Sequence, residues 1–187
     1  MARKLDQILV VDVESTCWDG APPEGEESEI IEIGLCVVDV KDLQRSSKHS
    51  ILVRPERSSI SDFCTQLTTL TPEMFSEAGT LAGATKRMKK EFLSQERLWA
   101  SWGDYDRRQF ERVCLSAGVG YPFGLTHLNV KTLFAVSLGL GHEVGLDRAC
   151  EILGVEMEGT HHRGDDDAWN IAGILCGILS ESRNIGG

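Results

Sequence analysis

Two carboxylates, Asp12 and Glu14, lie two positions apart in the apolar run ILVVDVESTCW near the N-terminus. In a β-strand, residues i and i+2 project to the same face of the sheet. Two acids on one face of a buried strand repel each other and are costly to desolvate. Because the strand contains no basic residue that could pair with them, we expect a cation to lie between the two carboxylates.

Acids also occur at two later positions where the chain turns into an expected helix. Asp106 follows the run WASWGDY, and Asp167 lies in HHRGDDDAWNIAGIL with His162 five residues before it. Each acid has a structural alternative. Asp106 or its neighbour Asp104 could cap a helix, and the triplet 165–167 could interact with a helix dipole.

These acids and a histidine together fit a metal-assisted phosphoryl transfer. Several carboxylates can hold two divalent cations about 3.5–4 Å apart, which clamp the attacking and leaving oxygens of the reaction. Oxygen ligands without cysteine or multiple histidines point to Mg²⁺ or Mn²⁺ rather than to zinc. A histidine on a loop has the pKa range to deprotonate water at neutral pH. His161 and His162 both occupy such a loop, and both could instead be ordinary surface residues.

Composition limits the classes of protein that fit. The chain has 187 residues, 41% hydrophobic and 26% charged, which suits one globular domain. It shows no signal peptide and no apolar stretch long enough for a membrane span, so we expect a cytoplasmic protein with no membrane partner. A net charge of −10 argues against broad binding to duplex nucleic acid. A small site that holds one strand end through metal ions remains compatible with that charge.

The order of expected elements predicts an α/β domain. Strands come first, joined by an acidic loop at 19–28, and later strands alternate with helices, which indicates a mixed sheet covered by helices. One domain should span 1–187, with a core at about 6–180 and a flexible tail at 181–187. The expected strands are 7–16, 29–40, 49–55, 97–103 and 125–130, and the expected helices are 80–95, 106–118, 131–141, 145–155 and 165–180.

The motifs in this order resemble the DEDDh 3′–5′ exonucleases. The most similar branch is the histone-mRNA exonuclease and RNA-interference-enhancer group, with its bacterial sporulation-pathway relatives. The resemblance implies an RNase H-like fold with a mixed five-stranded sheet flanked by helices. The matching segments, from residue 8 to about 175, are VVDVESTCW, EIIEIG, VRPERSSISDFCTQLTTLTPEM, SWGDYDRRQF, LNVKTLF and GTHHRGDDDAWNIA.

The resemblance also implies roles for the acids and the histidine. Asp106 is favoured over Asp104 because the acid follows an aromatic residue, and His162 is favoured over His161 because four residues separate it from Asp167. His162 would then be the general base. The residues that would hold two divalent cations, Mg²⁺ or Mn²⁺, are Asp12, Glu14, Asp106 and Asp167.

Substrate contacts follow from the same resemblance. Phe63 and Leu67 would sandwich the terminal base, although both could instead pack in the core. Ser15 and Thr16 would meet the terminal sugar, and Tyr105 would flank the base. A base stacked on an aromatic face is held with little regard to sequence.

The expected function is therefore a metal-dependent 3′–5′ exonuclease that releases nucleoside 5′-monophosphates. Its partners would be 3′ ends of single-stranded RNA, or of single-stranded DNA or short oligonucleotides, and a protein partner is left open. Two alternatives are a regulatory docking protein that keeps the fold, and a phosphohydrolase that acts on mononucleotides. Asp165 is an additional acid where the resembling family commonly has an apolar residue, and the roles of Asp165 and of the insert 19–28 are left open.

Overall fold

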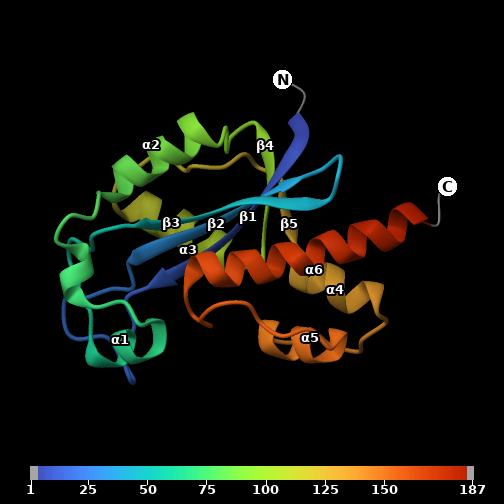
Figure 1. The fold of residues 1–187 in the computed structure, drawn as a ribbon. Helices are drawn as coiled ribbons and strands as arrows, with labels where there is room; N and C mark the ends of the chain where they lie inside the picture. The colour runs from blue at the N-terminus through green and yellow to red at the C-terminus, as the bar shows by residue number, and fades with distance from the viewer. Residues whose placement is uncertain (1–3, 185–187) are drawn as a thin grey trace.

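A computed structural model that describes residues 4–184 shows a five-stranded mixed sheet with helices on both faces (Figure 1). The strand order is β3-β2-β1-β4-β5, with β1 antiparallel to β2 and parallel to β4. The strands are β1 Lys4–Ser15, β2 Ile30–Asp39, β3 Gln44–Leu52, β4 Arg97–Ser101 and β5 His127–Asn129. The helices are α1 Asp62–Thr68, the 3₁₀-helix η1 Pro72–Phe75, α2 Leu81–Glu91, α3 Tyr105–Ser116, α4 Val130–Ser137, α5 Leu146–Leu153 and α6 Gly164–Asn184.

Alternation along β1 decides which face carries the acids. Val11 and Val13 belong to a core cluster that includes residues of α2 and α3. Val10 belongs to a second cluster, on the opposite face, with residues of α4, α5 and α6. Asp12 and Glu14 have the same parity as Val10, so they project toward the side of the sheet that α6 covers.

The start of α6 rests directly on β2 through two glycines. A Cβ atom on Gly34 would lie 1.8 Å from the carbonyl carbon of Gly164, far inside van der Waals contact. A Cβ atom on Gly164 would lie 3.0 Å from the backbone oxygen of Asp12. This close approach is possible only without side chains, and it sets the first turn of α6 beside the end of β1.

Gly34→Ala should therefore destabilise the protein. The new methyl group would meet backbone atoms, which cannot rotate away, so we expect a cost at or above the upper end of the roughly 1–3 kcal/mol typical of overpacking. Gly177→Ala is the matched control, because nothing lies within 4 Å of its Cβ position in α6. Urea unfolding should show a loss for the first variant and none for the second. Equal stability of Gly34→Ala and wild type would contradict the close approach.

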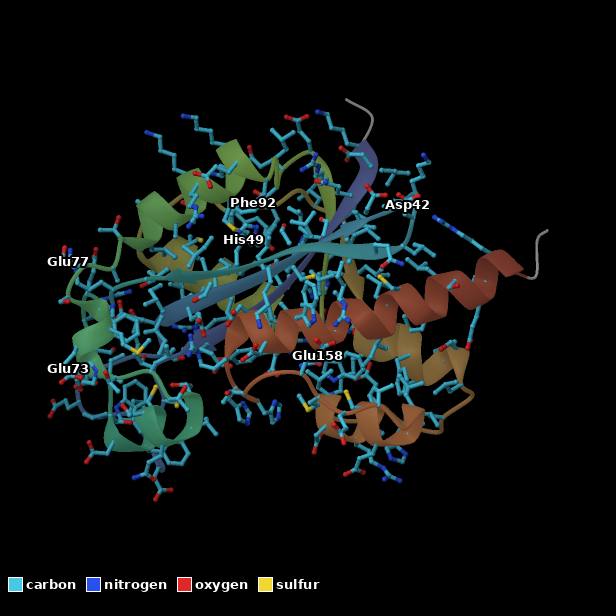
Figure 2. All side chains as sticks on the ribbon, viewed as in Figure 1. Asp42, His49, Glu73, Glu77, Phe92 and Glu158 are labelled. Carbon is cyan, nitrogen blue, oxygen red and sulfur yellow. The ribbon has the colours of Figure 1, made fainter. Side chains whose placement is uncertain are left out.

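The predicted elements are present, the differences concern mainly their ends, and the segment 53–80 also contains the short helices α1 and η1. The third strand is Gln44–Leu52 rather than 49–55, because its first half is an exposed, polar edge strand that hydrophobicity does not reveal. The helix predicted at 80–95 ends at Glu91, and Phe92 then contacts His49 of β3, with ring centroids 4.9 Å apart (Figure 2). The final helix runs to Asn184, so the predicted flexible tail is helical up to that residue, and 185–187 lie outside the described residues.

Between residues 4 and 184, no helix combines the length and the apolar character that crossing a membrane requires. The six cysteines are free thiols.

Candidate active site

Four carboxylates from three elements line one cleft of about 320 Å³ at the end of β1. Asp12 and Glu14 come from β1, Asp106 from the first turn of α3, and Asp167 from the first turn of α6. Carboxylate oxygens of Asp12, Glu14 and Asp167 lie within 4.8 Å of one another. The side chain of Asp106 is fixed to β1, since its Oδ1 accepts a hydrogen bond from the backbone N–H of Val13 at 2.9 Å.

The electrostatics of this cluster favour a bound cation. Burial raises the pKa of Glu14 to about 9 and the pKa of Asp106 to about 6. Burial also holds the pKa of Asp12 well above its usual range, and repulsion by Asp106 and Glu14 adds to that effect. Such carboxylates bind protons because burial and mutual repulsion outweigh the attraction of Arg163 for Glu14, so their ionised form needs further positive charge. Divalent cations would supply that charge, and an all-oxygen donor set suits Mg²⁺ or Mn²⁺.

The choice between Asp104 and Asp106 is decided by their positions. Asp106 is buried and lines the cleft. Asp104 lies outside the cleft lining, and its carboxylate pairs with Arg107 at 3.3 Å and Arg108 at 3.9 Å on the surface of α3. The structure therefore places Asp106, and not Asp104, among the four acids of the cleft.

The additional acid at the start of α6 turns away from the cleft. Asp165 lies 3.5 Å from Nζ of Lys48 on β3, and Asp166 contacts the same amine. Asp166 also accepts a hydrogen bond from the backbone N–H of Thr160 at 2.7 Å. These contacts join α6 to the edge strand, so the charge of Asp165 is compensated there rather than added to the cluster.

The two histidines lie on the loop that precedes α6, and both line the cleft. His162 has a left-handed backbone, with φ of 64°, an uncommon state for a residue other than glycine that often marks functional sites. Its backbone N–H donates to Oδ2 of Asp167 at 3.0 Å. Burial, and then the neighbouring His161, lower the pKa of His162, which favours the neutral ring that a base requires.

His161 has a contact for which sequence reasoning gave no reason. Its Nδ1 lies 3.1 Å from both carboxylate oxygens of Asp167, and its ring stacks on that of His162 with centroids 4.0 Å apart. The sequence HH does not indicate which of two adjacent rings contacts an acid elsewhere in the chain. The different contacts of His161 and His162 with Asp167 could therefore not be predicted from it.

Glu32, in the segment EIIEIG, is a further buried acid beside the cluster. No role was predicted for it. It lies opposite Glu14 in the register of β1 and β2. Its carboxylate accepts hydrogen bonds from Arg163 at 2.9 and 3.2 Å and from the backbone N–H of Gly164 at 2.9 Å. Glu32 thus fixes the histidine loop to the sheet. An acid inside an apolar strand was the available signal, as it was for Asp12.

Three of the predicted substrate contacts line the cleft. Ser15, Leu67 and Tyr105 are among its lining residues, and Tyr105 is 57% exposed. Phe63 lies outside the lining but precedes Leu67 by one turn on α1, and both keep more than a third of their surface exposed, at 38% and 36%. Core packing therefore does not account for these two side chains.

Thr16 is not brought to the cleft. Its backbone N–H donates to Glu29 at 2.8 Å, and its hydroxyl donates to the carbonyl of Glu27 at 3.1 Å and accepts from the N–H of Glu29 at 2.9 Å. The residue closes the base of the acidic loop, which accounts for its burial. Glu27 in that loop also pairs with Arg57 and Arg112, so the second half of the insert is anchored to the protein.

The fold and the acid-lined cleft agree with a comparison to protein families. Residues 9–175 match the Exonuclease family, RNase_T, and the chain belongs to that family. The DEDDh resemblance expected from the motifs, and the α/β fold that it implied, are confirmed.

Individual relatives extend this result. The chain is 29% identical to human 3′-5′ exoribonuclease 1 over 94% of its own length and 53% of the relative's, and 24% identical to the probable 3′-5′ exonuclease KapD of Bacillus subtilis over 87% and 80%. The nuclease domain of 3′hExo, a DEDDh family member bound to rAMP, superposes with a TM-score of 0.85 at 28% identity, covering 96% of this chain and 95% of that one. The chain thus spans about half the length of the human relative.

Proposed function

We propose that this protein is a metal-dependent 3′–5′ exonuclease that removes nucleotides from the 3′ end of single-stranded RNA and releases nucleoside 5′-monophosphates. The observation that carries the proposal is the meeting of four acids and a histidine in one cleft of a chain from the Exonuclease family. RNA is favoured over DNA because the human relative is named an exoribonuclease and the 3′hExo domain was solved with rAMP. The cytoplasmic location expected from the sequence stays a prediction.

In this proposal Asp12, Glu14, Asp106 and Asp167 hold two divalent cations, Mg²⁺ or Mn²⁺. When bound, the cations neutralise charge at the scissile phosphate and favour the ionised form of the attacking water. The donor set fits them, because oxygens of three of these acids lie within 4.8 Å and burial raises their proton affinity in the absence of a cation.

The other residues of the cleft bind the strand end and move a proton. The neutral ring of His162 accepts the proton of the water that attacks phosphorus. Leu67 and Tyr105 offer exposed apolar and aromatic surface to the terminal nucleotide, with Phe63 one turn away from Leu67. Ser15 lines the cleft and accepts a hydrogen bond from Gln109 at 2.9 Å, and in this proposal its hydroxyl contacts the terminal sugar.

A strand-end assay tests the proposal. A 5′-labelled single-stranded RNA is incubated with Mg²⁺, with Mn²⁺ or with EDTA, beside the same RNA carrying a 3′-phosphate block. We expect a ladder that shortens from the 3′ end with metal, is absent with EDTA, and is slowed by the block. An intact band with both metals, on RNA and on single-stranded DNA, would instead favour a docking protein or a mononucleotide phosphohydrolase.

A further inference from the structure

Beside the four-acid cluster lies a second group of possible metal ligands with a different chemistry. Ring nitrogens of His161 and His162 and a carboxylate oxygen of Asp167 lie within 4.8 Å of one another. Nδ1 of His161 lies 3.1 Å from the Asp167 carboxylate, and its ring stacks on that of His162, so an ion bound here replaces that hydrogen bond and turns the two rings toward itself. The side chain of His161 is 42% exposed, so an ion in solution can reach it.

Backbone hydrogen bonds fix the loop that carries these three side chains. The N–H of Asp167 donates to the carbonyl of Arg163 at 2.9 Å, and the N–H of Arg163 donates to the carbonyl of Thr160 at 3.2 Å. The guanidinium of Arg163 is in turn fixed by the fully buried carboxylate of Glu32. A loop anchored at both ends loses little further conformational freedom when its side chains bind an ion, which favours binding.

The donor set distinguishes this group from the catalytic cluster. Two imidazoles and one carboxylate form a frequent ligand set for Zn²⁺, whereas carboxylate oxygens alone suit Mg²⁺ and Mn²⁺. Divalent affinity for such a site follows the order Mn²⁺ < Fe²⁺ < Co²⁺ < Ni²⁺ < Cu²⁺ > Zn²⁺, so the late metals of the series are favoured over Mn²⁺. We propose that His161, His162 and Asp167 form a second binding site, which shares Asp167 with the four-acid cluster, for a Zn²⁺-class transition-metal ion.

Occupancy of this site opposes the activity proposed above. The ion takes a carboxylate from the four-acid cluster, through Asp167, and takes the ring that would accept the proton of water, through His162. Zn²⁺ is therefore an inhibitor of the Mg²⁺-dependent enzyme. This consequence rests on the proposed function, whereas the binding of Zn²⁺ does not.

Binding is measured first, without substrate. Zn²⁺ titration calorimetry is run on wild type, His161→Gln and Asp12→Asn in Mg²⁺ buffer, and Co²⁺ absorption reports the ligands. Loss of His161 should weaken binding by at least the roughly 10- to 100-fold that loss of a partner around a metal ligand costs. Asp12→Asn should not weaken Zn²⁺ binding, because Asp12 is not a ligand of this site and its loss weakens only the Mg²⁺ that competes for Asp167. Equal affinity of His161→Gln and wild type, or a thiolate charge-transfer band in the Co²⁺ spectrum, would overturn the site.

Inhibition is measured separately. Zn²⁺ is titrated into the Mg²⁺ reaction of wild type and of His161→Gln, each compared with its own zinc-free rate. We expect the half-inhibiting concentration to rise in the variant by the factor seen in calorimetry. Tight, His161-dependent binding without inhibition would refute the regulatory role alone. A protein that binds Zn²⁺ as expected but never cleaves RNA with Mg²⁺ would refute the proposed function and leave the metal site standing.

Discussion

Replacing Asp12 with asparagine should abolish nuclease activity and, in the absence of metal, stabilise the protein. The substitution removes one charge from a group of acids whose mutual repulsion and burial raise the pKa of Asp12. Loss of a metal ligand that acts as part of a unit should lower kcat by about 10³-fold or more. In EDTA near pH 8, relief of even 1 kcal/mol would raise Tm by roughly 2–4 °C in a protein of this size.

The matched control is Asp104→Asn, two residues before Asp106 but outside the cleft. It should change neither kcat nor Tm in EDTA by a comparable amount, because exposed ion pairs contribute only about 0–1 kcal/mol. RNA cleavage rates and thermal melts of the two variants measure the difference. An Asp12→Asn protein that still shortens RNA, or that melts lower than wild type in EDTA, would contradict the role of the acid cluster.

Residues that are locally unfavourable are the ones that sequence reasoning placed well. Asp12 and Glu14 interrupt an apolar strand, and the cost of burying them there can be recognised without a structure. The expected helix boundaries then put Asp106 and Asp167 near the starts of helices. Strand parity put both acids of β1 on one face of the sheet. That this is the face covered by α6 became known only from the structure.

What could not be predicted depends on contacts between distant parts of the chain. Glu32 binds Arg163, which lies 131 positions later, and no local pattern joins the two. Thr16 looked like a substrate contact because it follows the acidic pair, but its hydroxyl closes a loop onto Glu29. His161 contacts Asp167 from a loop that is left-handed at His162, a backbone conformation that nothing in HHRG requires.

The stability of the metal-free protein should fall as pH rises, and divalent metal should reverse the fall. The pKa of Glu14 is raised from 4.5 to about 9, so the folded state holds a proton that the unfolded state releases between these values. Because the unfolded state binds fewer protons in that window, the free energy of unfolding decreases there as pH rises. The contribution of Glu14 to stability is therefore greatest below about pH 4.5. Each tenfold difference in proton affinity between the folded and unfolded states corresponds to about 1.4 kcal/mol. The resulting change in the free energy of unfolding is large enough to measure.

Thermal melts from pH 5 to 9, with EDTA or with Mn²⁺, test this coupling. Metal at about 100 times its Kd should add about 2.7 kcal/mol to the free energy of unfolding. The gain should be larger at pH 8 than at pH 5, because at low pH the ion must displace protons. Asp12→Asn should flatten the EDTA curve and reduce the Mn²⁺ response, since it removes both a source of repulsion and a ligand. Burial lowers the pKa of His49, His127 and His162, and their titration makes stability rise with pH in the acidic part of this range. The test is therefore read at the alkaline end, where a Tm in EDTA that does not fall would contradict the raised pKa of the buried acids and remove the reason for expecting cations in the cleft.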